Sequence, residues 1–255
     1  MSEVTRQNGE YWEALAAHRR GESVDVLRGG GEVVSRDELA AMGDLVGKRV
    51  LQVAASIGDE SLSLALLGAE PTAVDIAPTH VNTGRAKAAE LGVEVDYRVG
   101  DMMALSDDLR DFDVIYISWG GLCWVPEIVS WVADMAERLT PGGRLVIAEH
   151  HPLWDVLSVT GPDRLGVTAS YFDQQWRGAR DLDKEPQIVE ELGLETTSHT
   201  SFVWNLGQVV TAMLRAELSI ATLWEYGSDE MYSGLDAGRH LPATYIIAGE
   251  RPLAQ

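Results

Sequence analysis

Short apolar runs alternate with helical patterns between residues 48 and 148, and this alternation constrains the fold more than any other sequence feature. The runs are short and rich in Val, Ile, Leu and Ala, which is typical of strands buried on both faces. Strands are therefore expected at Arg49–Ala54, Thr72–Ile76, Glu94–Val99, Phe112–Ser118 and Arg144–Ala148.

Helices are expected between these strands, around Leu62–Leu66, at about Pro78–Leu91 and at about Pro126–Leu139. Gly68 and Gly92 end the first two, as C-terminal glycines commonly do. Pro141–Gly143 is expected to be a turn. Repeated strand–helix units imply right-handed crossovers, so the sequence predicts an α/β fold with a doubly wound, mostly parallel sheet.

The alternation stops after residue 151 and resumes near residue 205. Residues 152–201 are rich in Asp, Gly, Pro and aromatic residues without clear periodicity. A helix at Leu206–Leu218 and strands at Ser219–Tyr226 and Ala243–Gly249 follow. We therefore expect one α/β domain (48–151 and 205–255), an inserted lid (152–204) and an N-terminal helical cover (1–47). In the cover, Ser35–Glu38 reads as a capping box that starts a short helix.

Composition limits the kind of partner. The chain has 255 residues with 20 basic and 40 acidic side chains, a net charge of −20 that repels nucleic acids and anionic membranes. No apolar run approaches the roughly 20 residues of a membrane span, and the N-terminus lacks the order of a signal peptide. Cys123 is the single cysteine, so no internal disulfide is expected, and a cytoplasmic location follows.

The carboxyl ends of the expected strands point to an adenosine pocket, because ligands of parallel sheets bind at that edge. Small residues at Ala54–Gly58 would let a ligand approach the backbone closely. Asp75 could accept two hydrogen bonds from a ribose diol. Asp101 could accept from an exocyclic amine while Met102 packs on a flat ring.

Other interpretations of these residues remain open. Asp75 could cap the helix that begins near Pro78, and Asp101 could cap the segment after it. A nicotinamide dinucleotide is disfavoured, because its fingerprint needs three spaced glycines and a helix N-terminus for phosphates. Asp59 and Glu60 would place negative charge at that position.

The order of these motifs resembles the class I S-adenosylmethionine-dependent methyltransferases. The resemblance covers roughly residues 48–151, through VLQVAASIGDESLSLALLGAEPTAVDIA, VDYRVGDMMAL, FDVIYISWGGLCWV and LTPGGRLVIAEHHP. It implies a Rossmann-like seven-stranded sheet, whose antiparallel seventh strand fits the C-terminal part, and S-adenosyl-L-methionine as the cofactor.

The resemblance also implies which residues bind the cofactor. The turn would lie near the methionine part, Asp75 and Ile76 at the ribose, Asp101 and Met102 at the adenine, and Ser118 and Trp119 beside the transferred methyl group. The family usually shows an acidic residue and three glycines where this chain has Gln52, Ala54, Ser56 and Gly58. Alanine and serine fit such a turn when φ stays negative. The residues expected at the turn are Ala54, Ala55, Ser56 and Gly58.

Acid–base residues follow the fifth expected strand. His150 or His151 could act as a general base at neutral pH, and Glu149 could orient a histidine or bind an acceptor amine. The alternative is that one histidine caps backbone groups and the other precedes Pro152 for conformational reasons. A metal site is not expected, because consecutive strand residues point to opposite faces.

Aromatic residues gather where an acceptor would bind, although packing alone explains several of them. A helix carrying Tyr11 and Trp12 could cover the cofactor or simply pack through Trp12. The residues expected at the acceptor are Trp124, Trp154, Tyr171 and Trp204.

The sequence thus predicts methyl transfer to oxygen, nitrogen or carbon of a small aromatic or hydrophobic metabolite. Two alternatives stay open, a cyclase or isomerase that keeps the cofactor without transferring methyl, and a non-catalytic binding module. A homodimer is also compatible with the sequence.

Overall fold

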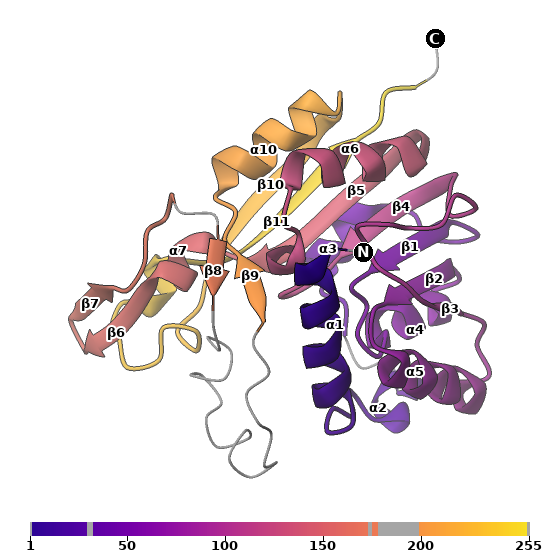
Figure 1. Ribbon diagram of the computed structural model, residues 1–255, viewed down its shortest axis with the longest axis horizontal. Coiled ribbons are helices and arrows are strands. Elements are labelled where there is room, and N and C mark those ends of the chain that lie inside the picture. The colour runs from indigo at the N-terminus through magenta and orange to yellow at the C-terminus, as the bar shows by residue number, and fades with distance from the viewer. Residues whose placement is uncertain (1, 30–32, 173–174, 178–198, 254–255) are drawn as a thin grey trace.

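A computed structural model describes residues 2–29, 33–172, 175–177 and 199–253, and a seven-stranded sheet forms its centre (Figure 1). The strand order is β10-β11-β5-β4-β1-β2-β3. All neighbours from β5 to β3 are parallel, whereas β11 is antiparallel to both β5 and β10. The strands are β1 (Arg49–Val53), β2 (Glu70–Asp75), β3 (Asp96–Val99), β4 (Phe112–Ile117), β5 (Leu139–His150), β10 (Ser219–Gly227) and β11 (Pro242–Glu250). The predicted α/β class and mostly parallel sheet are confirmed.

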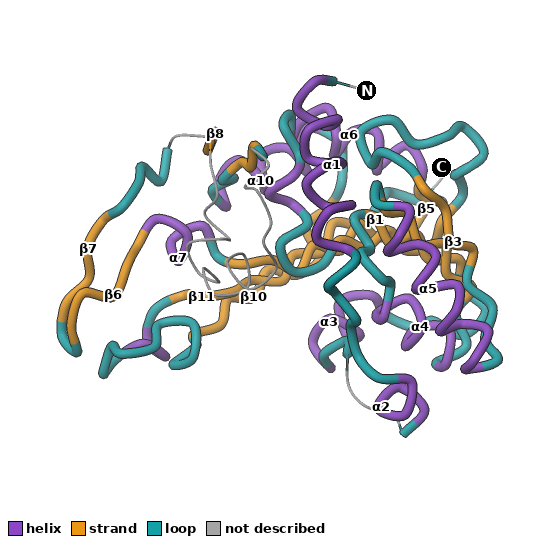
Figure 2. The backbone as a smooth tube through the Cα atoms, turned by 60° about the horizontal axis from the view of Figure 1, so that its bottom comes forward, coloured by secondary structure: helices purple, strands orange, loops and turns teal. Residues whose placement is uncertain are grey.

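Helices lie on both sides of this sheet, as the tube view shows (Figure 2). Helices α6 and α10 pack together on one face, while α3 contacts β5 and β11 from the other. Ser35 caps α3 in a complete capping box with Glu38, as the sequence predicts. The helices are α1 (Glu3–Ala16), α2 (Val24–Arg28), α3 (Arg36–Met42), α4 (Asp59–Leu66), α5 (Pro78–Leu91), α6 (Ile128–Arg138), α7 (Pro152–Val156) and α10 (Leu206–Arg215), with short 3-10 turns η1 (Leu122–Trp124) and η2 (Gly238–His240).

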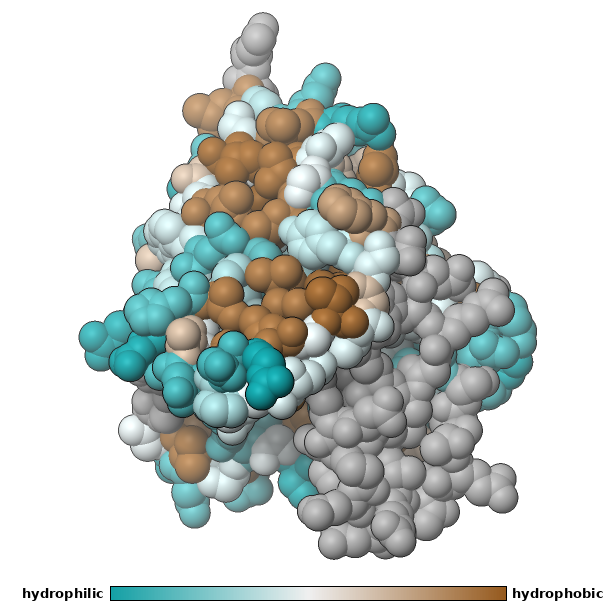
Figure 3. All heavy atoms as spheres, turned by 90° about the vertical axis from the view of Figure 1, so that its left-hand side faces the viewer, coloured by the Kyte–Doolittle hydropathy of each residue, from teal (hydrophilic) through white to brown (hydrophobic). Residues whose placement is uncertain are grey.

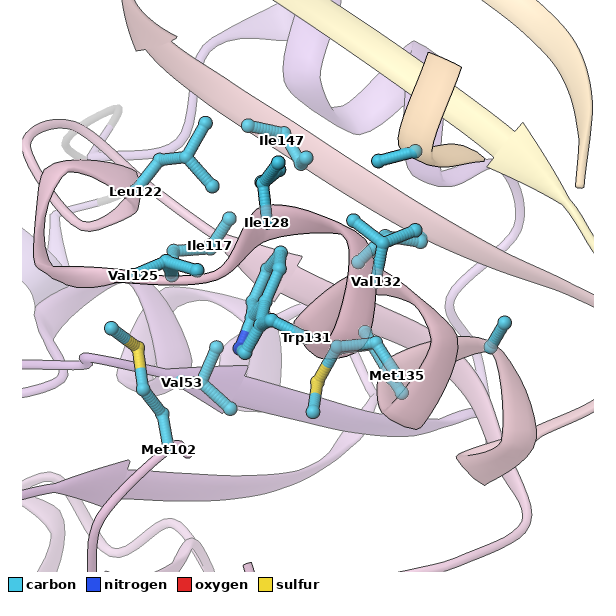
Figure 4. Packing of buried hydrophobic residues seen from close by; sticks show 14 of the residues in the cluster. Val53, Met102, Ile117, Leu122, Val125, Ile128, Trp131, Val132, Met135 and Ile147 are labelled. Carbon is cyan, nitrogen blue, oxygen red and sulfur yellow. The ribbon is translucent and has the colours of Figure 1, made fainter. Parts of the chain in front are cut away.

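The apolar strands are explained by burial on both faces. In β4, Ile115 and Ile117 join the cluster under α6, whereas Val114 and Tyr116 join the cluster under α3. Trp131 of α6 is 1% exposed and packs at the centre of the first cluster (Figure 4). Met102 lies at the border of this cluster, so the same packing that stabilises the core also fixes a residue at the sheet edge.

The predicted turn at Pro141–Gly143 is wrong, because β5 begins at Leu139 and includes these residues. The amide of Gly142 donates to the carbonyl of Arg251, and the amide of Arg251 donates to the carbonyl of Gly143. Pairing with the chain after β11 therefore makes this segment part of the strand. Gly142 has a φ of +80° there, a conformation that glycine adopts readily.

The segment expected to be a lid contains short regular elements rather than irregular chain alone. After α7 come the hairpin of β6 (Leu157–Gly161) and β7 (Arg164–Val167), then β8 (Gln175–Arg177) paired with β9 (Thr200–Phe202). Residues 178–198 lie outside the described part, so the division at 152–204 stays a prediction.

Strand β10 forms one end of the described sheet. Figure 3 looks at the left-hand side of the molecule in Figure 1 and shows hydrophobic residues gathered on part of its surface. In β10, Leu223 is 40% and Trp224 38% exposed. Native proteins usually cover such an exposed apolar sheet edge with another element or place charged side chains on it.

Candidate cofactor and acceptor site

A hollow of about 710 Å³, including its part open to solvent, lies at the carboxyl edge of the parallel strands. Its walls come from α1, the turn after β1, the ends of β2, β3 and β4, and the start of α5. The lining residues are Thr5, Asn8, Trp12, Arg19, Ala54, Ser56, Asp75, Ile76, His80, Gly100, Asp101, Met102, Met103, Trp119, Gly120, Gly121 and Trp124.

The turn after β1 has an unusual backbone. Ala54 and Ser56 both have φ of +50°, so the condition under which alanine and serine fit such a turn, a negative φ, is not met. The amide of Ala55 donates to the carbonyl of Val74, and the amide of Ser56 donates to Asp75. These bonds to β2 hold the turn in a left-handed conformation that costs a non-glycine residue roughly 1–2 kcal/mol.

Gly58 is the N-cap of α4, and glycine is required there by sterics. Its φ is +76°, and a Cβ atom there would lie 2.8 Å from the Tyr97 ring. The Tyr97 hydroxyl donates to the Gly58 carbonyl at 3.2 Å. Gly58 and the buried Ala55 therefore shape the turn from behind, and neither lines the hollow.

Asp75 ends β2 and lines the hollow with little exposed surface. Its Oδ2 accepts from the Ser56 amide at 2.7 Å, and its Oδ1 accepts from the Ala77 amide at 2.9 Å. His80 lies 3.2 Å from the same Oδ1. The helix-cap interpretation of Asp75 is wrong, because the N-cap of α5 is Ala77. The Asp75 carboxylate instead binds the amides of Ser56 and Ala77 and still forms part of the wall.

Asp101 and Met102 follow β3 and line the same hollow. One Asp101 oxygen accepts from the Met103 amide at 2.8 Å, which leaves the second oxygen for a ligand donor. Met102 and Ile76 provide apolar walls on neighbouring strand ends. The structure thus brings together the carboxylates and apolar side chains that the sequence assigns to ribose and adenine.

Ser118 lies beneath the hollow, in a buried polar cluster with Gln52 and Glu60. The Ser118 hydroxyl is 3.2 Å from Glu60 Oε1, and the Gln52 amide nitrogen is 3.3 Å from Glu60 Oε2. Gln52 in turn accepts from the amide and hydroxyl of Ser61. Burial raises the pKa of Glu60, and the nearby Asp59 charge adds to the shift.

Glu149 holds the loop after β4. Its carboxylate accepts from the amides of Gly120 at 2.6 Å, Leu122 at 2.8 Å and His150 at 2.7 Å. The side chain is 9% exposed. Since the loop carries Trp119 and Gly120 in the wall of the hollow, Glu149 determines the position of these residues.

The two histidines after β5 differ in their surroundings. His150 adjoins the hollow, with its ring centroid 6.1 Å from that of Trp119 and 5.1 Å from that of Trp154. His151 is buried, accepts from the Leu153 amide through Nδ1 and lies 3.0 Å from Glu225 through Nε2. Burial lowers the pKa of His151, although Glu225 opposes the shift.

Two of the four predicted acceptor aromatics lie near the hollow. Trp124 lines it, and Trp154 packs beside His150. Trp204 instead donates to the Val125 carbonyl, and Tyr171 packs edge-on against Phe172. Neither Trp204 nor Tyr171 is among the lining residues.

Helix α1 forms the wall opposite the strand ends. Trp12 lines the hollow, while Tyr11 is buried behind it, with its ring centroid 4.4 Å from that of His199. Asn8 exchanges two hydrogen bonds with the backbone of Thr200, at 2.8 and 2.9 Å. The N-terminal helix is thereby joined to β9.

Sequence reasoning missed His80, Asn8 and Arg19 as lining residues. His80 could have been found, because it is in the first turn of a helix that starts three residues after Asp75. Asn8 and Arg19 are brought to the site by the packing of α1, for which the sequence carries no local signal. Arg19 lies over the Trp12 ring at 4.8 Å.

Within the described residues, no cluster of His, Cys, Asp and Glu could hold a metal ion. No helix in the described part of the chain has the length and apolar character needed to span a membrane.

Residues 50–143 match a family model described as a methyltransferase domain. The ubiquinone biosynthesis O-methyltransferase of Xanthomonas oryzae pv. oryzae is 35% identical over 133 residues, which are 51% of this chain and 55% of that protein. The chain thus spans about half the length of the curated relatives it matches.

Solved structures share the fold across most of the chain. A S-adenosylmethionine-dependent methyltransferase from Mesorhizobium loti has a TM-score of 0.64 at 18% identity, covering 84% of this chain and 96% of that one. The [4+2]-cyclase SpnF has a TM-score of 0.63 at 15% identity, covering 99% and 98%. Residues 50–143 are thus similar to a methyltransferase domain, and the whole fold is the Rossmann-like fold that solved S-adenosylmethionine-dependent methyltransferases share.

Proposed function

We propose that this protein binds S-adenosyl-L-methionine and transfers its methyl group to a small aromatic or hydrophobic metabolite. The observation that carries the proposal is the placement of Asp75, Asp101 and Met102 around one hollow at the strand ends. The hydrogen-bond acceptors and apolar surfaces fit an adenosine moiety, with a carboxylate at the end of β2 for the ribose and a carboxylate beside an apolar thioether for adenine.

When bound, the cofactor supplies a sulfonium-activated methyl group, and the protein has to align the acceptor and exclude water. Trp12, Trp119 and Trp124 contribute aromatic surface to the hollow, which suits a sulfonium through cation–π attraction. The same rings suit a planar acceptor. Glu149 acts as a positioning residue, because its carboxylate accepts hydrogen bonds from the backbone amides of Gly120, Leu122 and His150.

His150 is the better of the two predicted general bases. It adjoins Trp119 at the rim of the hollow, with its Nδ1 3.5 Å from Glu149 Oε1, whereas His151 is buried and contacts the Leu153 amide and Glu225. A base is needed only when the acceptor atom loses a proton. His150→Gln should therefore lower kcat for a hydroxyl or amine acceptor while leaving cofactor affinity unchanged, and His151→Gln should leave kcat largely unchanged.

The first experiment is calorimetry with S-adenosylmethionine and S-adenosylhomocysteine. Dissociation constants below about millimolar are expected, and no binding of either would refute the proposal. Incubation with labelled methyl donor and a metabolite extract then tests transfer. Binding without label incorporation would favour a cyclase, isomerase or non-catalytic module, which the fold also accommodates.

Asp75→Ala tests the ribose contact. Loss of the carboxylate should weaken binding of S-adenosylhomocysteine by about 1–3 kcal/mol. Asp113→Ala is the matched control. Asp113 lies near the N-terminal end of β4, away from the hollow, so this variant should leave the affinity for S-adenosylhomocysteine unchanged. An unchanged affinity in Asp75→Ala would contradict the assignment.

We also propose that the protein works in the cytoplasm on small molecules rather than nucleic acids, on the basis of its −20 charge and single cysteine. A homodimer through the β10 edge is supported by the exposed Leu223 and Trp224. Sedimentation velocity should show a dimer for the wild type and a monomer for Trp224→Lys. A monomeric wild type would exclude the homodimer.

A further inference from the structure

His80 is a buried histidine with an incomplete set of hydrogen bonds. It occupies the first turn of α5, has 0% exposed surface and forms part of the wall of the hollow. Its Nδ1 lies 3.2 Å from Asp75 Oδ1. Within the described residues its Nε2 has no hydrogen-bond partner.

The hydrogen between His80 Nδ1 and Asp75 Oδ1 belongs to the histidine. An ionised carboxylate only accepts, so the Nδ1 atom of His80 carries the hydrogen and donates it to Asp75 Oδ1. The Ala77 amide donates to the same oxygen. Oδ1 thus accepts two hydrogen bonds, whereas Oδ2 accepts one, from Ser56, and retains capacity for a ligand donor.

Packing alone does not account for a histidine at position 80. The neighbouring Trp12 ring lies with its centroid 6.0 Å from that of His80, and Ile76 lines the same wall. An apolar side chain would fill this volume without leaving a buried nitrogen unpaired, a loss that costs about 1–3 kcal/mol. A histidine at such a cost points to a role through Asp75, its hydrogen-bond partner among the described residues.

We propose that His80 is a positioning residue for nucleoside recognition: by holding Oδ1 of Asp75, it presents Oδ2 to the 2′,3′-diol of the ligand ribose. This inference rests on the proposed function, since it takes the adenosyl group to occupy the hollow. A carboxylate fixed at one oxygen by two donors cannot rotate its second oxygen away from the diol. His80 therefore sets the preference for a ribose over a sugar without hydroxyls.

The test compares two substitutions at position 80. His80→Leu keeps apolar volume and removes the donor, whereas His80→Asn retains an N–H near the place of Nδ1. Binding of S-adenosylhomocysteine and of its 2′,3′-dideoxy analogue is measured by calorimetry for the wild type and both variants. Thermal unfolding of each variant verifies that it is folded at the assay temperature.

We expect the wild type to bind the diol form at least tenfold more tightly than the dideoxy form. In His80→Leu this ratio should fall below about threefold, and in His80→Asn it should stay near the wild-type value. A His80→Leu variant that weakens both ligands by the same factor, or leaves the ratio unchanged, would overturn the inference. Wild-type protein that binds S-adenosylhomocysteine without preference for the diol would overturn it and leave the proposed function standing. Absence of binding to either ligand would refute both.

Discussion

Among single residues, Ala54 and Ser56 carry the clearest conformational cost. Both have φ of +50° in a turn whose amides bond to Val74 and Asp75. Left-handed backbone is unfavourable for side chains with a Cβ, and it persists where surrounding contacts over-determine it. The turn therefore stores strain beside the Asp75 carboxylate.

Replacing Ala54 with glycine should relieve this strain. We expect Ala54→Gly to raise the free energy of unfolding by up to about 1 kcal/mol, the left-handed penalty less the extra entropy of glycine. Urea unfolding measures the change. The matched control is Ala89→Gly on the exposed side of α5, where the same exchange should lower stability by about 1 kcal/mol. If both variants change the free energy of unfolding in the same direction, the backbone at Ala54 is not strained.

Sequence patterns identified Asp75, Asp101 and Met102 because strand ends follow directly from short apolar runs. They did not identify the sign of φ at Ala54, since that sign depends on hydrogen bonds to β2. His80 and Glu149 owe their roles to partners five and about 27–29 residues away. Such pairings are properties of the tertiary structure.

On the scale of elements, two attachments hold the walls of the hollow. Glu149 of β5 binds the backbone of the loop after β4, and Asn8 of α1 binds the backbone of β9. Both use a side chain to satisfy main-chain groups of another element. A single substitution, at Glu149 or at Asn8, should therefore remove one attachment and leave the other intact.

Glu149→Gln replaces one acceptor oxygen with an NH₂ group that faces a backbone amide. We expect the free energy of unfolding to fall by about 1–3 kcal/mol, because a buried donor loses its partner. Hydrogen exchange at Gly120 and Leu122 should accelerate. Glu230→Gln, at an exposed position, is the control and should change stability by less than about 0.5 kcal/mol. Unaltered exchange at Gly120 would contradict the role of Glu149.

Asn8→Ala removes both bonds between α1 and Thr200. Amides of α1 should then exchange faster, while amides of the buried strand β4 should lose protection only by as much as global stability falls. Gln7→Ala removes a side chain whose amide donates to Glu3 at the surface, and it serves as the control. If α1 amides exchange at the wild-type rate in Asn8→Ala, the aromatic contacts of Tyr11 rather than Asn8 hold the helix.

The boundaries of α5 agree with the prediction from its proline and glycine, whereas β5 extends beyond its predicted start. The helix signals are local, because Pro78 and Gly92 act through their own backbone. The extension of β5 depends on pairing with Arg251, more than a hundred residues away. The short strands β8 and β9 likewise lacked a periodic pattern because each has only three residues.

On the scale of the whole molecule, the half-buried Glu60 links stability to pH. Because the native pKa is raised above the ordinary value of 4.5, the folded state binds this proton more tightly than the unfolded state. The stabilising contribution is complete below the unfolded pKa and is lost as pH rises through the folded pKa. Acidic proteins of net charge −20 also repel themselves at higher pH, so a variant is needed to separate the two effects.

Glu60→Gln provides that separation, since a neutral amide keeps partners in Gln52 and Ser118. Its advantage in unfolding free energy over the wild type should grow as pH rises from about 4.5 to 8. Urea unfolding of both proteins across this range measures the difference. A difference that stays constant with pH would mean that Glu60 does not titrate between these limits in the folded state.

The loop after β4 takes its path from Glu149, not from the side chain at position 119. Trp119, which is 38% exposed, can therefore be exchanged without removing a bond that shapes its own backbone. If the proposed methyl transfer holds, saturation mutagenesis at this one codon gives direct engineering control over which metabolites the enzyme accepts.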